Sequence, residues 1–331
     1  MYDKIKISIP EGINELLRKD ALDFRILKPN GEINLNAFIN TLIMNYYETF
    51  AADEEELRDG INKALSSVPE RYSRAAFDEI IKTVAKRERG WYEDDRTVVI
   101  SFKPTKQSES VIIYVENVLL HNESLSSFYR RLLISYARKN KTERERIIHK
   151  TTYDLLCKAI KKQLQVCISL DNGHIYNGTS LYAVAPAKDE MYNYVLAYSD
   201  KKSRTLRLAK IKTVSLLATK GEIPTENAQM FERQIRFGAQ YPIYSTDNEP
   251  VKVQLTNKGK ALFEKIYLYR PTPTSIDGDI YTFECSANQI LYYFERFGSE
   301  ALILSPKKLG IFMRNYYYYA LKKYRTVYGK D

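Results

Sequence analysis

Residues 179–216, with the sequence TSLYAVAPAKDEMYNYVLAYSDKKSRTLRLAKIKTVSL, decide the fold of the middle of the chain. Short apolar and hydroxyl-rich stretches alternate in this segment. The turn signals Asp171-Asn172-Gly173 and Asn177-Gly178 stand just before it. Regular short strands separated by turns are typical of small β-barrels. We therefore expect a β-barrel domain over residues 166–222.

The strongest local charge signal lies inside this domain, where residues 201–212 hold six cations and no acidic residue. Tyrosines precede these cations. Arginine presents a bidentate fork to phosphate, and tyrosine offers a stacking face and a hydroxyl. If this stretch is a strand, alternation places the Arg207 and Leu206 side chains on opposite faces of the sheet. The candidate nucleic-acid-binding residues are Tyr194, Tyr198, Lys201, Lys202, Arg204, Arg207 and Lys210. A hairpin whose lysines and arginines are simply solvated is the alternative.

The same segment resembles a WYL domain. The resemblance rests on Ser180–Pro186, Tyr194–Tyr198 and Arg204–Ile211. It implies an Sm/SH3-like barrel that carries a basic pocket for a ligand or a nucleic acid. The namesake triplet corresponds to Asn193, Tyr194 and Val195, so only its tyrosine is retained, and Lys210 stands where the family motif ends in arginine.

Beyond residue 223 the chain alternates between strand and helix patterns. We expect strands over 251–255, 280–285 and 301–304, and helices over 228–237, 257–266, 287–297 and 306–325. This order predicts a ferredoxin-like α+β domain over residues 223–331. The domain resembles the extension that often follows WYL domains, through Tyr292-Tyr293-Phe294, Phe297-Gly298 and Ile303–Pro306. Tyr316 to Tyr319 circle a helix, so we expect some of them to fill a dimer interface.

The N-terminal region contains an internal repeat. The alternating segment Lys4–Ile9 corresponds to Thr97–Phe102, with Ile5 and Val98 lying 93 positions apart. The apolar positions of a following helix recur 90 positions later. They are Leu35, Phe38, Leu42, Ile43 and Tyr46, matched by Leu125, Phe128, Leu132, Leu133 and Tyr136. Each copy is therefore predicted to be a strand followed by helices. The matched positions of the two copies indicate a duplication.

This duplication resembles the ribbon-helix-helix family. The resemblance implies that the outward residues of two paired strands enter the DNA major groove. Those residues would be Lys4, Lys6 and Ser8 in one copy, and Thr97, Val99 and Ser101 in the other. A scaffold or dimerisation module is at least as consistent with the second, uncharged strand. We expect this tandem domain to span residues 1–141 with inserted helices, one of them over 73–89, followed by a connecting helix over 142–165.

The composition and the missing motifs exclude several classes of protein function. The 331 residues include 51 Lys+Arg and 41 Asp+Glu, a formal net charge of +10. The three cysteines form no CxxC pair, and no secretory signal or membrane-spanning run occurs, so a cytoplasmic location is expected. The three histidines have no metal-ligand spacing, and no phosphate loop, nucleophile elbow or HExxH motif is present. We therefore expect no enzymatic activity, no catalytic or metal site and no cofactor.

Taken over its whole length, this multidomain α+β chain resembles the WYL accessory proteins of type VI-D CRISPR systems. The resemblance implies single-stranded RNA binding, a homodimer, and enhancement of the RNA-guided, RNA-cleaving effector. Two other functions remain open. One is a ligand-responsive DNA-binding transcription regulator that uses Lys4 and Lys6, and the other is a scaffold without affinity for nucleic acid.

Overall fold

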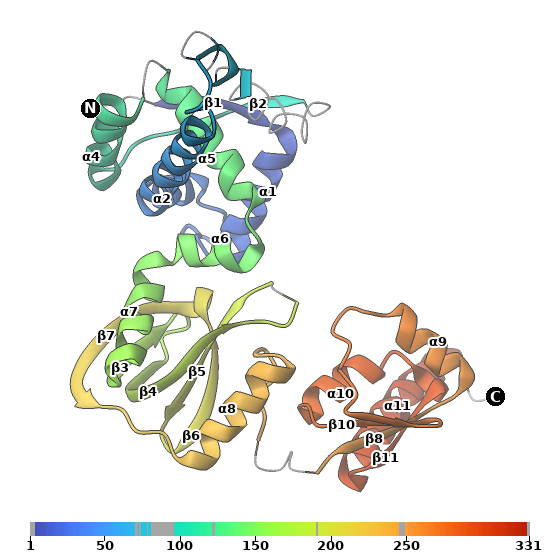
Figure 1. Cartoon of the computed structure of the whole chain (residues 1–331). Helices are drawn as coiled ribbons and strands as arrows, with labels where there is room; N and C mark the ends of the chain where they lie inside the picture. Colours follow the sequence, from blue (N-terminus) through green and yellow to red (C-terminus); the bar gives the residue numbers. More distant parts are fainter. Residues whose placement is uncertain are drawn as a thin grey trace. The chain divides into compact units, whose positions relative to one another are not determined.

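The computed structural model describes residues 4–69, 72, 74–77, 79–80, 96–120, 123–189, 191–244 and 249–329. Within these residues the protein is a mixed α+β structure with three antiparallel sheets (Figure 1). The chain divides into two compact units, Met1–Lys150 and Thr151–Asp331.

The first unit contains a two-stranded antiparallel sheet of β1 (Ile5–Pro10) and β2 (Thr97–Phe102). Ile5, Ile7 and Ile9 are buried, as are Ile100 and Phe102. Ile7 pairs with Ile100, and these residues are separated by the same 93 positions as the two sequence copies. The register is therefore symmetric about this pair. The repeat thus places the two copies side by side as a sheet with one apolar face.

The long helices of the two copies supply the core of this unit. They are α2 (Leu35–Ala64) and α5 (Leu125–Arg138), and each begins at an equivalent N-cap, Asn34 or Ser124, whose side chain accepts a backbone N–H. Four of the five repeated apolar positions are buried in both helices, whereas Leu35 and Leu125 are half-buried. The Phe38 and Tyr136 rings lie 6.2 Å apart. The other helical elements are α1 (Glu11–Asp23), α4 (Lys106–Tyr114), the π-helix η1 (Val115–Leu119) and α6 (Lys141–Ile148).

Helix α2 continues through the acidic segment 53–59 to Ala64, because the glutamates, leucine and arginine of this segment favour helix. One expectation for this region needs correction. The stretch expected as one helix over 142–165 is two helices, α6 and α7 (Lys150–Lys162), followed by a strand. The break falls at His149, whose ψ of 28° leaves helical geometry and whose Nε2 lies 3.1 Å from the Phe24 carbonyl oxygen. The helix expected over 73–89 lies mostly outside the described residues.

The second unit begins with α7 and a five-stranded antiparallel sheet. Its strands are β3 (Leu164–Leu170), β4 (Ile175–Pro186), β5 (Asn193–Ser199), β6 (Lys202–Arg207) and β7 (Ile211–Lys220), in the order β6-β5-β4-β3-β7. Leu156 and Ala159 of α7 pack into its apolar core. The expected closed barrel is not seen in the described residues, because β7 pairs with β3 and leaves β6 as an edge. Edge strands that carry several cations, such as Lys202, Arg204 and Arg207 here, resist pairing with other chains.

After α8 (Thr225–Phe237), a second sheet follows in the order β11-β8-β10-β9. Its elements are β8 (Val251–Leu255), α9 (Asn257–Lys265), β9 (Ser275–Asp277), β10 (Ile280–Phe283), α10 (Ala287–Phe294), the 3₁₀ turn η4 (Gly298–Glu300), β11 (Ala301–Ser305) and α11 (Lys307–Tyr328). The short strand β9 was not expected. It forms through a hairpin turn in which Gly278 adopts a φ of +59°.

Candidate nucleic-acid interface

The hairpin between β5 and β6 positions the predicted cations. Ser199 pairs with Lys202, so Asp200 and Lys201 form a two-residue loop, with φ values of 51° and 59°. Positive φ at both loop residues is the geometry of a type I′ turn, which matches the twist of the flanking strands. The turn holds Lys201 and Lys202 at the exposed tip of the hairpin. Lys210 is also exposed, at the end of the 3₁₀ turn η2 (Leu208–Lys210) that leads from β6 to β7.

The two predicted arginines lie on opposite faces of β6. Leu206 belongs to the apolar core beside Val195, and Arg204 shares its side of the strand. Arg207 points to the other side. The structure therefore does not bring Arg204 and Arg207 together in one pocket.

Each arginine is held on a tyrosine ring. The Arg204 guanidinium lies 5.1 Å from the centroid of the Tyr176 ring, and 3.7 Å from the Asp200 carboxylate. Its Nε is buried without a hydrogen-bond partner in the described residues. The Arg207 guanidinium lies 3.5 Å from the centroid of Tyr192. Stacking of this kind holds the planar guanidinium in a fixed orientation.

Tyr194 and Tyr198 share the face of Arg207, because they pair with Arg207 and Ser203 across the strands. Helix α8 packs on this face. Asn227 donates to Ser203 Oγ at 3.0 Å, and Gln234 donates to Thr205 Oγ1 at 2.9 Å. Tyr194 and Tyr198 are accordingly half-buried. They are positioned beside the cations but expose only part of their rings.

Further tyrosines of this unit lie near Tyr192, and the sequence analysis did not select them. Tyr269 and Tyr292 make an edge-on ring contact at 5.5 Å, and the Arg296 guanidinium lies 5.6 Å from the Tyr292 ring. Burial raises the pKa of Tyr269, and nearby Asp189 raises it further. The side chain of Lys188 donates to Thr272 Oγ1 at 2.7 Å and so joins the β4–β5 loop to this region. Tyr176 was also missed, because its approach to Arg204 depends on the packing of β4 and not on sequence distance.

The remaining predicted residues, Lys4 and Lys6, belong to the first unit. Lys6 is exposed on β1 and Lys4 is exposed directly before it, and the outward residues of the neighbouring strand β2 are Thr97, Val99 and Ser101. Val99 is 66% exposed, so this strand surface is part apolar. Arg130 of α5 donates to the Ser8 carbonyl oxygen at 2.5 Å.

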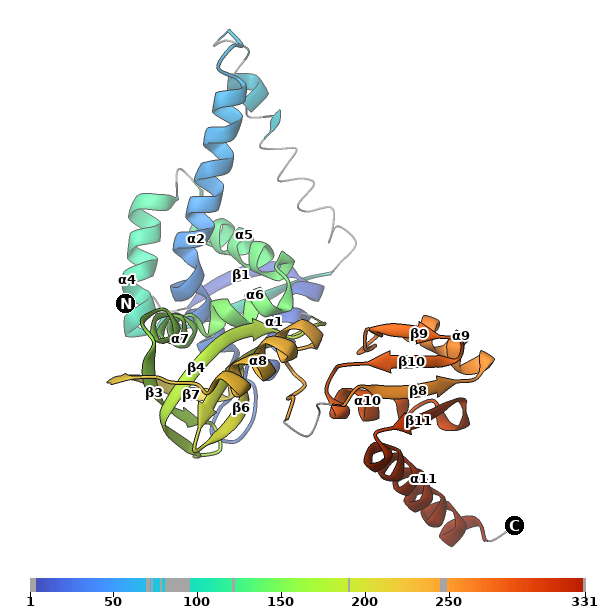
Figure 2. The same ribbon diagram turned by 60° about the horizontal axis from the view of Figure 1, so that its bottom comes forward.

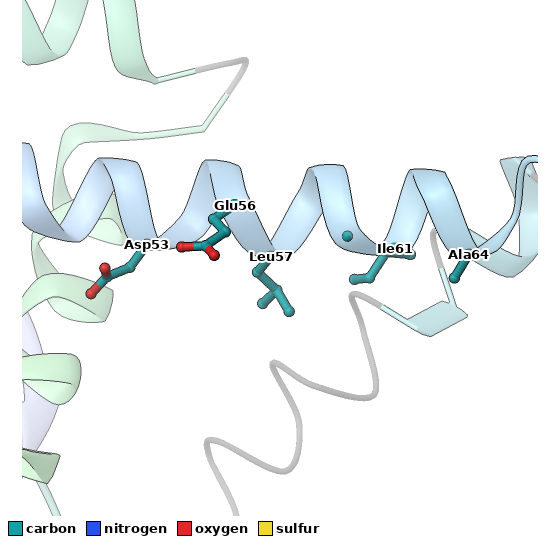
Figure 3. A pocket seen from close by; sticks show the side chains of 6 residues that line it. Asp53, Glu56, Leu57, Ile61 and Ala64 are labelled. Carbon is teal, nitrogen blue, oxygen red and sulfur yellow. The ribbon is translucent and has the colours of Figure 1, made fainter.

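A pocket in the first unit is lined by none of these residues. Asp53, Glu56, Leu57, Gly60, Ile61 and Ala64 line it along the second half of α2 (Figure 3). The lining contains two carboxylates and no cation, so its charge does not complement a polyanion. Among the described residues, no group of three or more histidine, cysteine or carboxylate side chains could hold a metal ion. None of the described helices is long and apolar enough to cross a membrane.

Comparison with known proteins shows a shared fold but no assigned family. No family model matches the chain, and no curated protein matches it. The chain is similar to a solved structure described as the crystal structure of a CRISPR Cas-related protein. That similarity has a TM-score of 0.67 and 18% sequence identity, and it covers 99% of this chain and 95% of the other. A weaker likeness, to proteasome accessory factor B/C of Arthrobacter aurescens, has a TM-score of 0.24 and 15% identity over 66% of this chain and 35% of that one. The chain therefore shares the fold of the CRISPR Cas-related protein over almost its whole length.

Proposed function

We propose that this chain is a non-enzymatic, CRISPR-associated accessory protein of the cytoplasm that binds single-stranded RNA. The observation that carries the proposal is the edge of the β5–β6 hairpin, where exposed lysines flank two arginines seated on tyrosine rings. The whole-length likeness to a CRISPR Cas-related protein supports the CRISPR association. No acidic residue occurs between residues 201 and 212 to repel phosphate.

Each part of this surface has a separate task in the proposed binding. Lys201, Lys202 and Lys210 contact phosphates and supply affinity through release of counterions. Arg204 and Arg207, oriented by Tyr176 and Tyr192, donate to phosphate oxygens through their guanidinium groups. Single strands suit the site because their bases can stack on the exposed parts of Tyr194 and Tyr198, whereas a duplex hides its bases.

The direct test removes the exposed charge without disturbing the core. The triple variant Lys201→Gln, Lys202→Gln and Lys210→Gln should bind a labelled single-stranded RNA about tenfold or more weakly at 100 mM salt, because it loses up to three phosphate contacts. The matched control replaces three exposed lysines of the C-terminal domain, Lys252, Lys258 and Lys265, by glutamine. Fluorescence anisotropy measures both variants. Equal affinity of the two variants would show that the hairpin edge is not the RNA site.

Enhancement of a type VI-D effector is the further part of this proposal. In a cleavage assay with the effector, guide and target RNA, addition of the wild-type chain should accelerate target cleavage. The hairpin triple variant should accelerate it less, whereas the control triple variant should act like wild type. Unchanged cleavage on addition of the wild-type chain would remove the effector from the proposal and leave RNA binding to be judged by itself.

For the finer fold, we propose a ribbon-helix-helix-like first unit, an open Sm/SH3-like WYL sheet and a ferredoxin-like C-terminal domain. The symmetric β1–β2 register supports the first assignment. The element order strand, helix, two strands, helix, strand from β8 to β11 supports the last. We also propose a homodimer through the C-terminal domain, since Tyr324, Val327 and Tyr328 leave apolar surface exposed on α11.

The symmetric β1–β2 sheet favours one alternative, a DNA-binding transcription regulator of the WYL family. Lys4 and Lys6 would then enter the major groove, and the WYL sheet would sense a small ligand. Competition between single-stranded RNA and duplex DNA of equal length, at one fixed salt concentration, separates the two functions. A preference for duplex DNA that Lys4→Gln with Lys6→Gln abolishes would establish the alternative. Binding to neither would leave a scaffold role.

A further inference from the structure

The C-terminal helix α11 carries a second concentration of positive charge. Its residues 307–328 include six cations, six tyrosines and no acidic residue. The cations are Lys307, Lys308, Arg314, Lys322, Lys323 and Arg325. The chain as a whole has a net charge of +10, so this one helix holds charge equal to more than half of the surplus.

The first half of α11 attaches the helix to its domain, and the second half leaves the domain. Leu309 and Met313 are buried against the sheet, and the Tyr317 hydroxyl donates to the Glu295 carbonyl oxygen at 3.0 Å. From Tyr318 onward every described residue of the helix is exposed. Figure 2 shows this part of α11 extending beyond β11. The distal half of the helix therefore continues from an anchored first half, and its side chains are accessible to a ligand.

Four side chains form a straight row on this exposed part. Arg314, Tyr318, Lys322 and Arg325 are spaced by four, four and three residues, which places them on one face of an α-helix. At 1.5 Å per residue the row is about 17 Å long. All four side chains are exposed. In the described residues none of these cations is paired with a carboxylate, and Arg314 donates instead to the neutral side chain of Asn315.

A polyanion fits this row better than another protein surface does. Three unpaired cations in line, without a neighbouring acid on the helix, offer no complementary charge to a second copy of the same row. A phosphate backbone supplies the missing charge, and release of its counterions makes the contact favourable. Tyr318 within the row adds a face on which a base can stack. Tyr328 follows Arg325 by three residues and so borders the row, whereas Tyr324 lies on a different face of the helix.

We propose that the row of Arg314, Tyr318, Lys322 and Arg325 is a second contact surface for single-stranded RNA, separate from the β5–β6 hairpin. This inference rests on the proposed RNA-binding function. The row extends the binding path with backbone contacts that do not depend on base sequence, whereas the hairpin edge holds oriented arginines.

The test uses the full chain with Arg314→Gln, Lys322→Gln and Arg325→Gln together. The plot of log affinity against log salt for a labelled single-stranded RNA should become shallower by about 2, since each lost phosphate contact removes roughly 0.7 from the slope. Affinity at 100 mM salt should fall about tenfold or more. The Lys252, Lys258 and Lys265 glutamine triple carries the same change in charge and should keep the wild-type slope. Tyr318→Ala should weaken binding severalfold without changing the slope.

The outcomes are distinct. An unchanged slope in the α11 triple, or an equal change in the control triple, would overturn the inference while leaving the hairpin site intact. Sedimentation equilibrium of the same variant checks its oligomeric state. If RNA affinity falls only because the variant no longer self-associates as wild type does, the row acts in assembly and the inference is wrong. If the wild-type chain shows no salt-dependent RNA binding at all, the proposed function itself fails.

Discussion

Two acid-free segments of this protein carry the same number of cations and present them in opposite ways. Residues 201–212 and α11 each hold six cations. In the first segment, Arg204 and Arg207 are half-buried on tyrosine rings and the strand beside them is part of the core. In α11 all six cations are exposed. Local charge density therefore predicts where a polyanion is attracted, and the packing around it decides whether the contact is oriented.

The largest expected difference between the two segments is in folding stability. Leu206→Ala should lower the free energy of unfolding by about 2–5 kcal/mol, because it leaves a cavity in the core of the β5–β6 sheet. Leu321→Ala on the exposed half of α11 should change it by less than about 0.5 kcal/mol. Urea unfolding at low protein concentration measures both. Similar losses in the two variants would mean that α11 is covered and that the contrast between the segments is false.

A smaller effect should locate the point where α11 is fixed to its domain. A Cβ atom at Gly310 would lie 2.8 Å from the Ile303 carbonyl oxygen, so the helix or β11 must shift to accept it. Gly310→Ala should cost roughly 1–3 kcal/mol, the usual range for overpacking.

Gly60→Ala is the control, since nothing lies within 4 Å of its added Cβ in α2 and alanine favours helix by about 1 kcal/mol. Thermal unfolding should move in opposite directions for the two variants. If Gly310→Ala is neutral, the attachment of α11 is looser than the structure shows.

Much of this fold follows from local patterns. The alternation of Ile5, Ile7 and Ile9, together with the offset of 93, predicts which strand faces are buried, and the observed Ile7–Ile100 pair agrees with it. The offset of 90 likewise identifies core positions of α2 and α5. These features were predictable because a strand with one buried face, or a helix with one, must repeat its apolar residues at a fixed period.

The sequence was less informative about tertiary contacts. Alternation along β6 already separates Arg207 from Leu206, but the partners Tyr176 and Tyr192 are set by strand register and loop packing. The open edge of β6 depends on the pairing of β7 with β3, which no local motif specifies. The row on α11 has a signal in the sequence, since residues 307–325 hold six cations and no acid, but charge alone does not predict which part of the helix is exposed.

An intermediate effect should show whether the tyrosine support of the hairpin arginines matters for binding. Tyr192→Ala removes the ring 3.5 Å from the Arg207 guanidinium. Loss of this stacking should weaken RNA binding by about 1–2 kcal/mol, or roughly 5- to 30-fold. Tyr192→Phe keeps the ring and should bind as wild type does. Anisotropy titrations decide the matter, and equal affinities for the alanine and phenylalanine variants would show that Arg207 needs no orienting ring.

The smallest expected effect concerns Asp200, the carboxylate that directly precedes the acid-free segment. It lies 3.7 Å from Arg204 and its side chain is 66% exposed, so Asp200→Asn should change stability by no more than about 1 kcal/mol. Asparagine tolerates the positive φ of this turn, so the hairpin should keep its shape. Removing the charge frees Arg204 for phosphate, and RNA affinity at low salt should rise by about two- to threefold and lose this gain as salt screens the charge.

The matched control for this variant is Asp279→Asn. It breaks an exposed ion pair with Lys260, whose atoms lie 2.7 Å apart, in the β9–β10 turn. It should leave RNA affinity unchanged. A fall in affinity for Asp200→Asn would mean that the carboxylate positions Arg204 for RNA and does not compete with it. No change in either variant would place Arg204 off the RNA path, and the hairpin edge would then resemble α11, a surface whose lysines attract the backbone without an oriented arginine beneath them.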